Sequence, residues 1–308
     1  MSLHPLTLGA LVADAAAMGL HWIYDQRHIA LVAPHEPVFF HPSPANYDNT
    51  QGYYAHPHRT SGDQSQYGEQ VLVMHRALEN GGLKNGTYYP AAYARAFHAH
   101  FGYGGAYVGY IDRATRDSLN NAIGVEDLTQ AKGSDDVQLP AIAKLPPLVA
   151  ALLEAEDDAF FKAVDAAVAV TNDNDISREY GRISAAMMRA AARGASAAEA
   201  VAAGRAHASP EAAALIDEAA TMATQTHNNA AAAHFGMACH LTSGIPVAVH
   251  NILLSQTYPE AIRRNIYAGG DTCGRAILIG AVMGALHGEG SETGIPKVWV
   301  GYLTEDLD

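Results

Sequence analysis

The sequence predicts an all-α protein that forms one compact multi-helix domain over residues 1–308. Nearly half of the residues are apolar, and only 17% are charged, which is typical of a chain with a large core. Alanine is abundant, and alanine has the highest helix propensity and lets helices approach closely. No segment shows the apolar–polar alternation of a strand, and no linker or low-complexity tract divides the chain.

Helix follows helix along the chain. Residues 5–20 are expected to form an apolar helix, and apolar residues recur at helical spacing from Tyr67 to Leu78. Ser196 and Ser209 are expected N-caps of later helices. The remaining segments with helical character are a short one within 21–37, then 63–81, 90–102, 109–124, 141–154, 157–172, 175–194, 196–208, 209–226, 236–255, 258–270, 271–288 and 295–303.

Two polar loops interrupt this pattern. Residues 37–62 are rich in proline, histidine, tyrosine and asparagine, and an irregular loop of this length is uncommon unless it is functional. Residues 129–140 form the second loop.

Charge and composition exclude several classes of partner. The formal net charge is −13, whereas a nucleic-acid surface needs clustered lysine and arginine. The N-terminus lacks the basic start of a signal peptide, and no window is long and apolar enough for a membrane span. The two cysteines, Cys239 and Cys273, fit a reducing compartment and lack metal-type spacing. We therefore expect a cytoplasmic protein that binds neither nucleic acid nor membrane.

Candidate functional residues lie where polar segments meet helix ends, because unpaired backbone groups there can bind a ligand. Asp63 precedes one expected helix, and Asp271 with Thr272 precedes another. For each aspartate alone, an N-cap is the more common role. Three glycines, at positions 280, 284 and 288, recur every fourth residue and are interpreted as a packing groove.

Two further polar segments and the histidines are less specific. Residues 171–175 are rich in oxygen donors but lack the calcium-loop pattern, so a helix end followed by an N-cap is the simpler interpretation. Asp135 and Asp136 belong either to a substrate loop or to a solvated one. Of the 16 histidines, His21, His56 and His58 are candidates for an acid or a base, although a lone histidine is more often only a polar group.

Taken in order, these segments resemble the ADP-ribosylglycohydrolase family, and within it the branch related to J1-crystallins. "GALVADAAAMGLHW" resembles the family's "G-x-L-x-G-D-A-x-G-x-P-x-E" start, and "GDQSQYGEQ" falls at its Thr-Asp-Asp-Thr motif. "GGDTCGRAILIGAVMGALHGEGSETGIPKVW" resembles its "G-G-D-T-D-T" signature, and "DDVQLPA" resembles the J1-crystallin branch. The likeness spans nearly the whole chain.

The resemblance implies an all-α fold with a dinuclear magnesium or manganese site that positions a ribose and a water. Such hard cations bind several oxygen ligands, and two of them can share the activation of water. The bond cleaved in the family is a glycosidic link to ADP-ribose. The implied ligand of this chain is therefore an ADP-ribose-like small molecule.

The chain departs from the family pattern at its acidic positions. In the preferred register Thr-Asp-Asp-Thr becomes residues 62–65, and a shift by one residue gives 61–64, so one aspartate survives either way. Cys273 and Gly274 stand where the signature has Asp and Thr, and His21 stands at the N-terminal acidic position. At most one Mg²⁺ or Mn²⁺ ion is expected, and an ion-free site is the alternative.

The resemblance, carried over by position, gives the expected site. The catalytic residues are Asp63, Asp271 and His21. The metal ligands are Asp63, Ser65, Asp271 and Thr272. The substrate-binding residues are Gly133, Ser134, Asp135, Gly269 and Gly270.

Two functions follow from these departures. The first is a hydrolase that cleaves a glycosidic bond to ADP-ribose or a related ligand with a degenerate metal site; two carboxylates across a pocket also suit metal-free glycosidic hydrolysis. The second is a non-catalytic, crystallin-like binding or structural relative that has lost the dinuclear centre.

Overall fold

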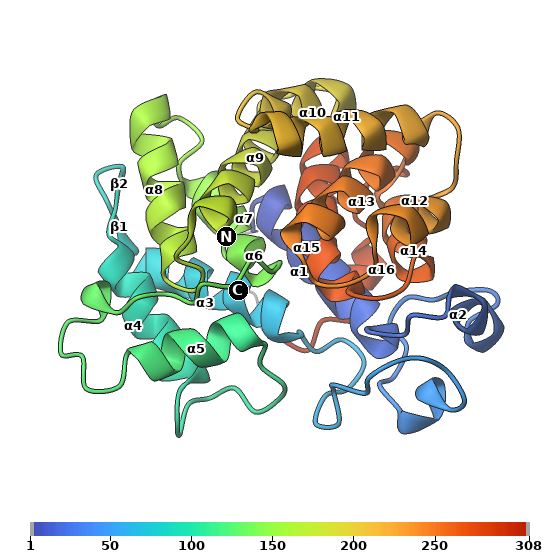
Figure 1. Cartoon of the computed structure of the whole chain (residues 1–308), viewed down its shortest axis with the longest axis horizontal. Coiled ribbons are helices and arrows are strands. Elements are labelled where there is room, and N and C mark those ends of the chain that lie inside the picture. The colour runs from blue at the N-terminus through green and yellow to red at the C-terminus, as the bar shows by residue number, and fades with distance from the viewer. Residues whose placement is uncertain (1–2, 306–308) are drawn as a thin grey trace.

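Two buried helices, α1 (Pro5–Ala17) and α15 (Thr272–His287), lie side by side in the middle of the molecule, and the other helices surround them (Figure 1). The computed structural model describes residues 3–305. One hydrophobic core extends from Leu6 to Trp299 and draws on helices from both ends of the chain. The all-α fold predicted from the sequence is confirmed.

The helices that follow α1 are α2 (Gln26–Val32), α3 (Gln66–Ala77), α4 (Pro90–Phe101), α5 (Arg113–Asn121), α6 (Pro140–Ala143), α7 (Leu145–Ala151) and α8 (Asp157–Ala169). They are followed by α9 (Asp175–Ala192), α10 (Ala197–Arg205), α11 (Pro210–Ala223), α12 (Asn228–Phe235), α13 (Leu241–Leu254), α14 (Tyr258–Tyr267) and α16 (Lys297–Val300). Short turns of helix are η1 (Met18–Leu20), η2 (Pro44–Tyr47), η3 (Leu78–Gly82) and η4 (Leu128–Gln130).

Glycine lets α1 and α15 approach until their backbones touch. A Cβ added at Gly9 would lie 2.2 Å from the Gly280 carbonyl oxygen, and one added at Gly280 would lie 2.3 Å from the Gly9 carbonyl oxygen. Gly284 packs against Gly9 and Pro5 on the same face. The expected groove is therefore confirmed for Gly280 and Gly284. Gly288 instead ends α15 with a φ of 69° and faces open space.

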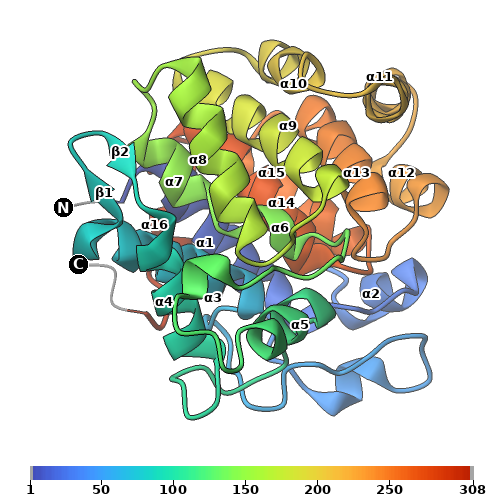
Figure 2. The ribbon, with the colours of Figure 1, turned by 60° about the vertical axis from the view of Figure 1, so that its left-hand side comes forward.

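Several helix ends match the sequence prediction. Ser196 forms a capping box with Glu199, and the Ser209 side chain caps α11. Asn174 caps α9, which confirms that residues 171–175 contain an N-cap. The turned view in Figure 2 shows α8 and α9 in front of α1 and α15, with α3, α4 and α5 beneath them.

Other elements differ from the prediction. The expected helix 141–154 is divided at Lys144 into α6 and α7, and Pro146 and Pro147 open the second of them. Helix α12 was not predicted, because its alanine run carries no apolar periodicity. A two-residue hairpin, β1 (Leu83–Lys84) and β2 (Thr87–Tyr88), turns at Asn85 and Gly86 with positive φ.

The long loop after α2 runs along the lower edge of the molecule in both views and carries η2 (Figures 1 and 2). Within the part of the chain that is described, no helix combines the length and apolar character required to cross a bilayer.

Candidate functional site

The site is built at the N-terminus of α15, where the Asp271 side chain caps the helix and is completely buried. Its carboxylate accepts hydrogen bonds from His21 Nε2 at 2.9 Å, from the Tyr67 hydroxyl at 2.7 Å and from the Gly274 N–H at 2.9 Å. Burial opposes ionisation, yet these donors hold the pKa of Asp271 below its ordinary value. Asp271 is therefore a buried carboxylate with three protein donors, which a plain helix cap does not need.

A second histidine extends this contact. His21 Nδ1 lies 2.8 Å from Nε2 of His56, and both imidazoles are at most 2% exposed. Burial, together with the nearby His21 and Arg59, places the pKa of His56 well below its ordinary value, so this ring is neutral. Asp271, His21 and His56 thus form a continuous chain. Among the described residues, His56 Nδ1 has no hydrogen-bond partner.

Backbone geometry holds His21 in place. Trp22 adopts a φ of +63°, which is uncommon for a bulky residue, and its N–H donates to the Gly270 carbonyl. The Gly270 N–H donates in turn to the Ile23 carbonyl. Gly270 has a φ of +68°, and a Cβ there would meet the Met237 carbonyl at 2.1 Å. The absence of a side chain at Gly270 therefore allows the backbone to pack closely beside Asp271.

Aromatic rings line the approach to the histidines. Trp22 lies against His21, with 4.4 Å between ring centroids, and Tyr110 meets Trp22 edge-on at 4.8 Å. Tyr53, from the same long loop that carries His56, contacts both Trp22 and Tyr110. Tyr53 is 57% exposed, so the cluster reaches the surface.

A second buried carboxylate, Asp14, lies in the last turn of α1. Its oxygens accept from the Ser65 N–H at 2.7 Å and the Ser65 hydroxyl at 2.6 Å, and the Cys273 thiol lies 3.8 Å from its backbone oxygen. Burial raises the pKa of Asp14 to about 7 against the hydrogen bonds from Ser65, which lower it. The sequence analysis did not select Asp14 as a site residue. The available signal was its position as an acidic residue inside "GALVADAAAMGLHW", the motif that resembles the family.

Replacing Asp14 by asparagine should remove a pH dependence of stability. The native carboxyl keeps its proton up to about pH 7, whereas the unfolded one loses it near a pKa of about 3.9. Between these values the native state binds more protons, so the contribution of Asp14 to stability falls as the pH rises. Urea unfolding at pH 4.5 and pH 7.5 should show Asp14→Asn gaining about 2–4 kcal/mol relative to wild type at the higher pH. An unchanged difference between the two pH values would refute the raised pKa.

Asp63 occupies a different environment from Asp271. It is part-exposed and accepts from the Thr60 N–H at 2.7 Å and from the Thr304 hydroxyl at 2.6 Å. The cap of α3 is Ser65, so the N-cap role considered for Asp63 is wrong. Two residues separate Asp63 from the start of α3 at Gln66. Asp63 therefore lies outside the helix and contacts Thr304 of the C-terminal segment. Among the residues that the structure describes, Asp63 and Asp271 share no hydrogen-bond partner.

The structure also places the remaining predicted residues. Ser65 is buried against Asp14, and the buried Thr272 hydroxyl has no partner among the described residues. Ser134 is buried, pairs its backbone with Thr171 and Asp173, and donates its hydroxyl to Asp117.

Loop 129–140 therefore packs against the turn between α8 and α9. Gly133 is close-packed there, since a Cβ would lie 2.4 Å from the Ala169 carbonyl oxygen. Asp135 is exposed, whereas Asp136 is buried and leaves Oδ1 without a partner among the described residues. Gly269, with a φ of +73°, accepts a hydrogen bond from Arg275 at its carbonyl.

The donor set does not fit the dinuclear magnesium or manganese centre that the resemblance implied. Each candidate carboxylate, at Asp14, Asp63 and Asp271, is already paired with protein donors. The side chains that cluster instead are His21, His56 and Cys273, which offer nitrogen and sulfur. Hard cations of this kind prefer several oxygen ligands. The described side chains that could hold a metal ion here are thus of a different chemical type.

A recess near the site opens to the surface. A hollow of about 500 Å³ lies between Tyr24, Gln51 and Met237, and so borders the Gly270 turn. Burial and the nearby Asp271 raise the pKa of Tyr24 to about 12.

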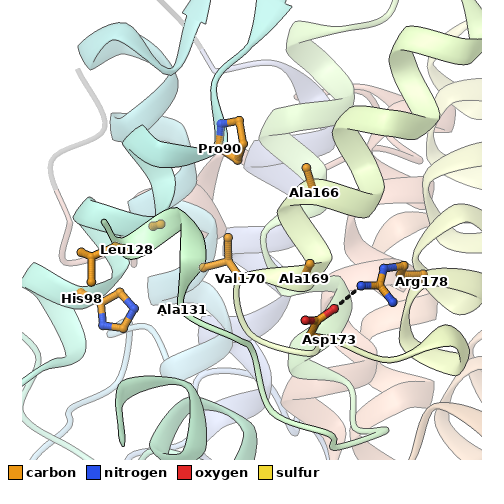
Figure 3. Close-up of a pocket in the computed structure, with 10 residues that line it drawn as sticks. Pro90, His98, Leu128, Ala131, Ala166, Ala169, Val170, Asp173 and Arg178 are labelled. Carbon is orange, nitrogen blue, oxygen red and sulfur yellow. Dashed lines mark hydrogen bonds and ion pairs between the residues drawn. The ribbon is translucent and has the colours of Figure 1, made fainter. Parts of the chain in front are cut away.

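A second pocket, of about 260 Å³, lies between α4 and α8 (Figure 3). It is lined mainly by apolar side chains around the Asp173–Arg178 ion pair. It shares no lining residue with the Asp271 site, so we place the chemistry at Asp271.

Comparison with known proteins agrees with this architecture. A sequence profile of ADP-ribosylglycohydrolase matches residues 6–308. Crystallin J1A of Tripedalia cystophora is 26% identical, over 95% of this chain and 89% of that protein. A solved structure described as an ADP-ribosylglycohydrolase-related protein complex superposes with a TM-score of 0.67 at 17% identity, covering 97% of this chain and 90% of that one. Because the profile match spans almost every residue, the chain belongs to the ADP-ribosylglycohydrolase family.

Proposed function

We propose that the protein hydrolyses a glycosidic bond in a small ADP-ribose-like ligand, with water activated at His56. The observation that carries this proposal is the buried chain Asp271–His21–His56, whose last nitrogen has no protein partner among the described residues. A carboxylate that orients one imidazole, which in turn contacts a second, is a recurrent way to position a general base.

The proton path follows from the hydrogen bonds. Both nitrogens of His21 are engaged, so Nδ1 of His56 is the position that can take a proton from water. The hydroxide oxygen bonds to the anomeric carbon, the glycosidic bond breaks with its electron pair on the leaving group, and the proton then passes to that group. As His56 takes this proton at Nδ1, it passes its Nε2 proton to Nδ1 of His21, so the positive charge develops on His21, where Asp271 stabilises it.

The surroundings suit such a ligand. The rings of Trp22, Tyr53 and Tyr110 offer apolar faces beside His21, and planar groups stack on such faces. The hollow at Tyr24 and Met237 adds volume next to the same turn. Gly269 and Gly270 support the ligand through this turn. Gly133, Ser134 and Asp135 remain predictions for a more distant part of the ligand.

The test is turnover of a panel of ADP-ribose N- and O-glycosides by wild type, His56→Gln and His58→Gln. His56→Gln should lower kcat/KM by about a hundredfold or more, because a positioned base contributes about 10²–10⁴ to the rate. His58 is an exposed histidine two residues along the same loop, so His58→Gln should turn over normally. Equal activity in the two variants would contradict the role of His56.

A second function, binding without catalysis, is favoured by the similarity to Crystallin J1A and by the departures at Gln64, Cys273 and Gly274. Calorimetry with ADP-ribose separates the two functions. Binding that Asp271→Ala abolishes, without turnover of any panel member by wild type, would support this second function over the first.

The remaining sequence predictions stay proposals. A single Mg²⁺ or Mn²⁺ held by Asp63, Ser65, Asp271 and Thr272 is tested by titrating each ion in the same calorimeter. Cytoplasmic location rests on Cys239 and Cys273, which are both unpaired.

A further inference from the structure

We propose that His21, His56 and Cys273 form a binding site for one borderline-soft divalent transition-metal ion of the Zn²⁺ type. Each residue offers one ligand atom, and these three atoms lie within 4.8 Å of one another. Three protein ligands with a fourth position left for water or substrate are the usual arrangement of a catalytic zinc ion. The proposal does not rest on the reaction proposed above, but it uses the same two histidines: an ion between them would replace the His21–His56 hydrogen bond that the reaction requires.

The spacing needs only a small adjustment. His21 Nδ1 and the nearest His56 nitrogen are 2.8 Å apart and share one proton. Around a tetrahedral ion with bonds of about 2.0–2.1 Å, two nitrogens lie roughly 3.3 Å apart. A shift of about half an ångström therefore lets an ion replace the shared proton.

The surroundings of His21 are those of a metal-ligating histidine. Its second nitrogen, Nε2, donates to the Asp271 carboxylate at 2.9 Å, which leaves Nδ1 directed toward the cluster. Metal-ligating histidines almost always make such a contact, because it fixes the tautomer and raises the basicity of the ligating nitrogen. Asp271 is itself fixed by Tyr67 and by the backbone of α15.

The chemistry and charge of the cluster also select the ion. Thiolate and imidazole donors bind zinc, copper and iron well and magnesium poorly. A Cys273 thiolate and the adjacent Asp271 carboxylate together supply two negative charges, which one divalent ion balances. The three ligands are at most 2% exposed, so little water competes for the ion.

Each ligand comes from a different part of the chain. His21 follows α1, His56 lies in the long loop, and Cys273 is in the first turn of α15. An ion here joins the loop to the two central helices. The long loop that carries His56 is irregular, whereas the other two ligands lie at or beside helices. Ion binding should therefore stabilise the position of this loop.

The test uses the full chain unfolded with a chelator and refolded with Co²⁺ as a spectroscopic substitute for Zn²⁺. Wild type should bind one equivalent and show a near-ultraviolet thiolate-to-cobalt band with visible bands of tetrahedral Co²⁺. Cys273→Ser should lose the near-ultraviolet band, and Cys239→Ser, the matched control, should keep it. Excess Mg²⁺ should not displace the ion, whereas Zn²⁺ should.

The histidine ligand and the orienting carboxylate are tested by affinity. Asp271→Asn should weaken Zn²⁺ binding by about tenfold to a hundredfold, as expected for a group that orients a ligand. His56→Gln should weaken it at least as much, while His58→Gln should not.

A measurement on wild-type protein tests the site even if the variants fail to fold. The zinc X-ray absorption spectrum of wild type should show one sulfur at about 2.3 Å and two nitrogens at about 2.0–2.1 Å. No Co²⁺ or Zn²⁺ bound by wild type, a spectrum without sulfur, or loss of the cobalt band in Cys239→Ser would each overturn the proposal. Hydrolysis by ion-free wild type would leave the proposed function standing even then.

Discussion

Asp271→Asn should lower both the stability of the protein and the hydrolytic activity proposed for it more than any other single change of a polar side chain near the site. The carboxylate is fully buried and accepts from His21, Tyr67 and Gly274. An asparagine keeps the size but offers one acceptor atom and turns an N–H₂ toward a former donor. Breaking such a buried charged contact costs about 3–5 kcal/mol.

The effect on catalysis should be larger still. Without the carboxylate, His21 loses the group that fixes its tautomer and stabilises its positive charge, so kcat should fall on the order of a thousandfold. Urea unfolding and initial rates on the glycoside panel measure the two effects separately.

Asp63→Asn is the informative comparison, because both aspartates precede a helix in the sequence. Asp63 is part-exposed and contacts Thr60 and Thr304, so its replacement should change stability by about 1 kcal/mol or less. If Asp63→Asn reduced activity as strongly as Asp271→Asn, the catalytic role predicted for Asp63 from the sequence would hold and the His56 assignment would need revision.

Gly280→Ala should destabilise the protein by about 3 kcal/mol through the contact between α1 and α15. In an isolated helix the same change would stabilise by about 1 kcal/mol, because alanine is the better helix former. Here the new Cβ would lie 2.3 Å from the Gly9 carbonyl oxygen and 2.5 Å from the Ala13 Cβ, so the two central helices must separate. The free energy of unfolding from urea titration measures the loss.

Gly301→Ala is the control for this substitution. Gly301 has a φ of −68°, and the nearest atoms to an added Cβ are 3.5 Å and 3.7 Å away. Its unfolding free energy should stay within about 0.5 kcal/mol of wild type. A Gly280→Ala protein as stable as wild type would show that the central helix pair can separate without cost.

The helical fold was largely accessible from the sequence. Alanine content, apolar periodicity and capping serines report local preferences, and these determine where helices form. The errors lie where local signals were absent or contradictory, as in the alanine run of α12 and the proline pair that opens α7. The packing of Gly280 was predictable because a four-residue spacing places glycines on one helix face.

The site was only partly accessible. Asp271 and His21 were selected by position, and the structure joins them by a hydrogen bond. Asp14 and Tyr67 were not selected as site residues, because Asp14 lies in a segment expected to form an apolar helix and Tyr67 belongs to the apolar pattern of another helix. The proximity of His56 and Cys273 could not be predicted from a sequence motif, because the two residues are more than two hundred positions apart.

The sequence by itself determined the fold class, the family resemblance and the loss of acidic residues from the family motifs. Only the tertiary structure decided which polar groups meet. Helix propensity and motif spacing act over a few residues, whereas the Asp271–His21 contact depends on α1 packing against α15. The direction of Asp63 depends in the same way on two residues of chain before α3 and on Thr304 near the opposite end. Such long-range packing gives the two aspartates different hydrogen-bond partners and brings nitrogen and sulfur donors to the site.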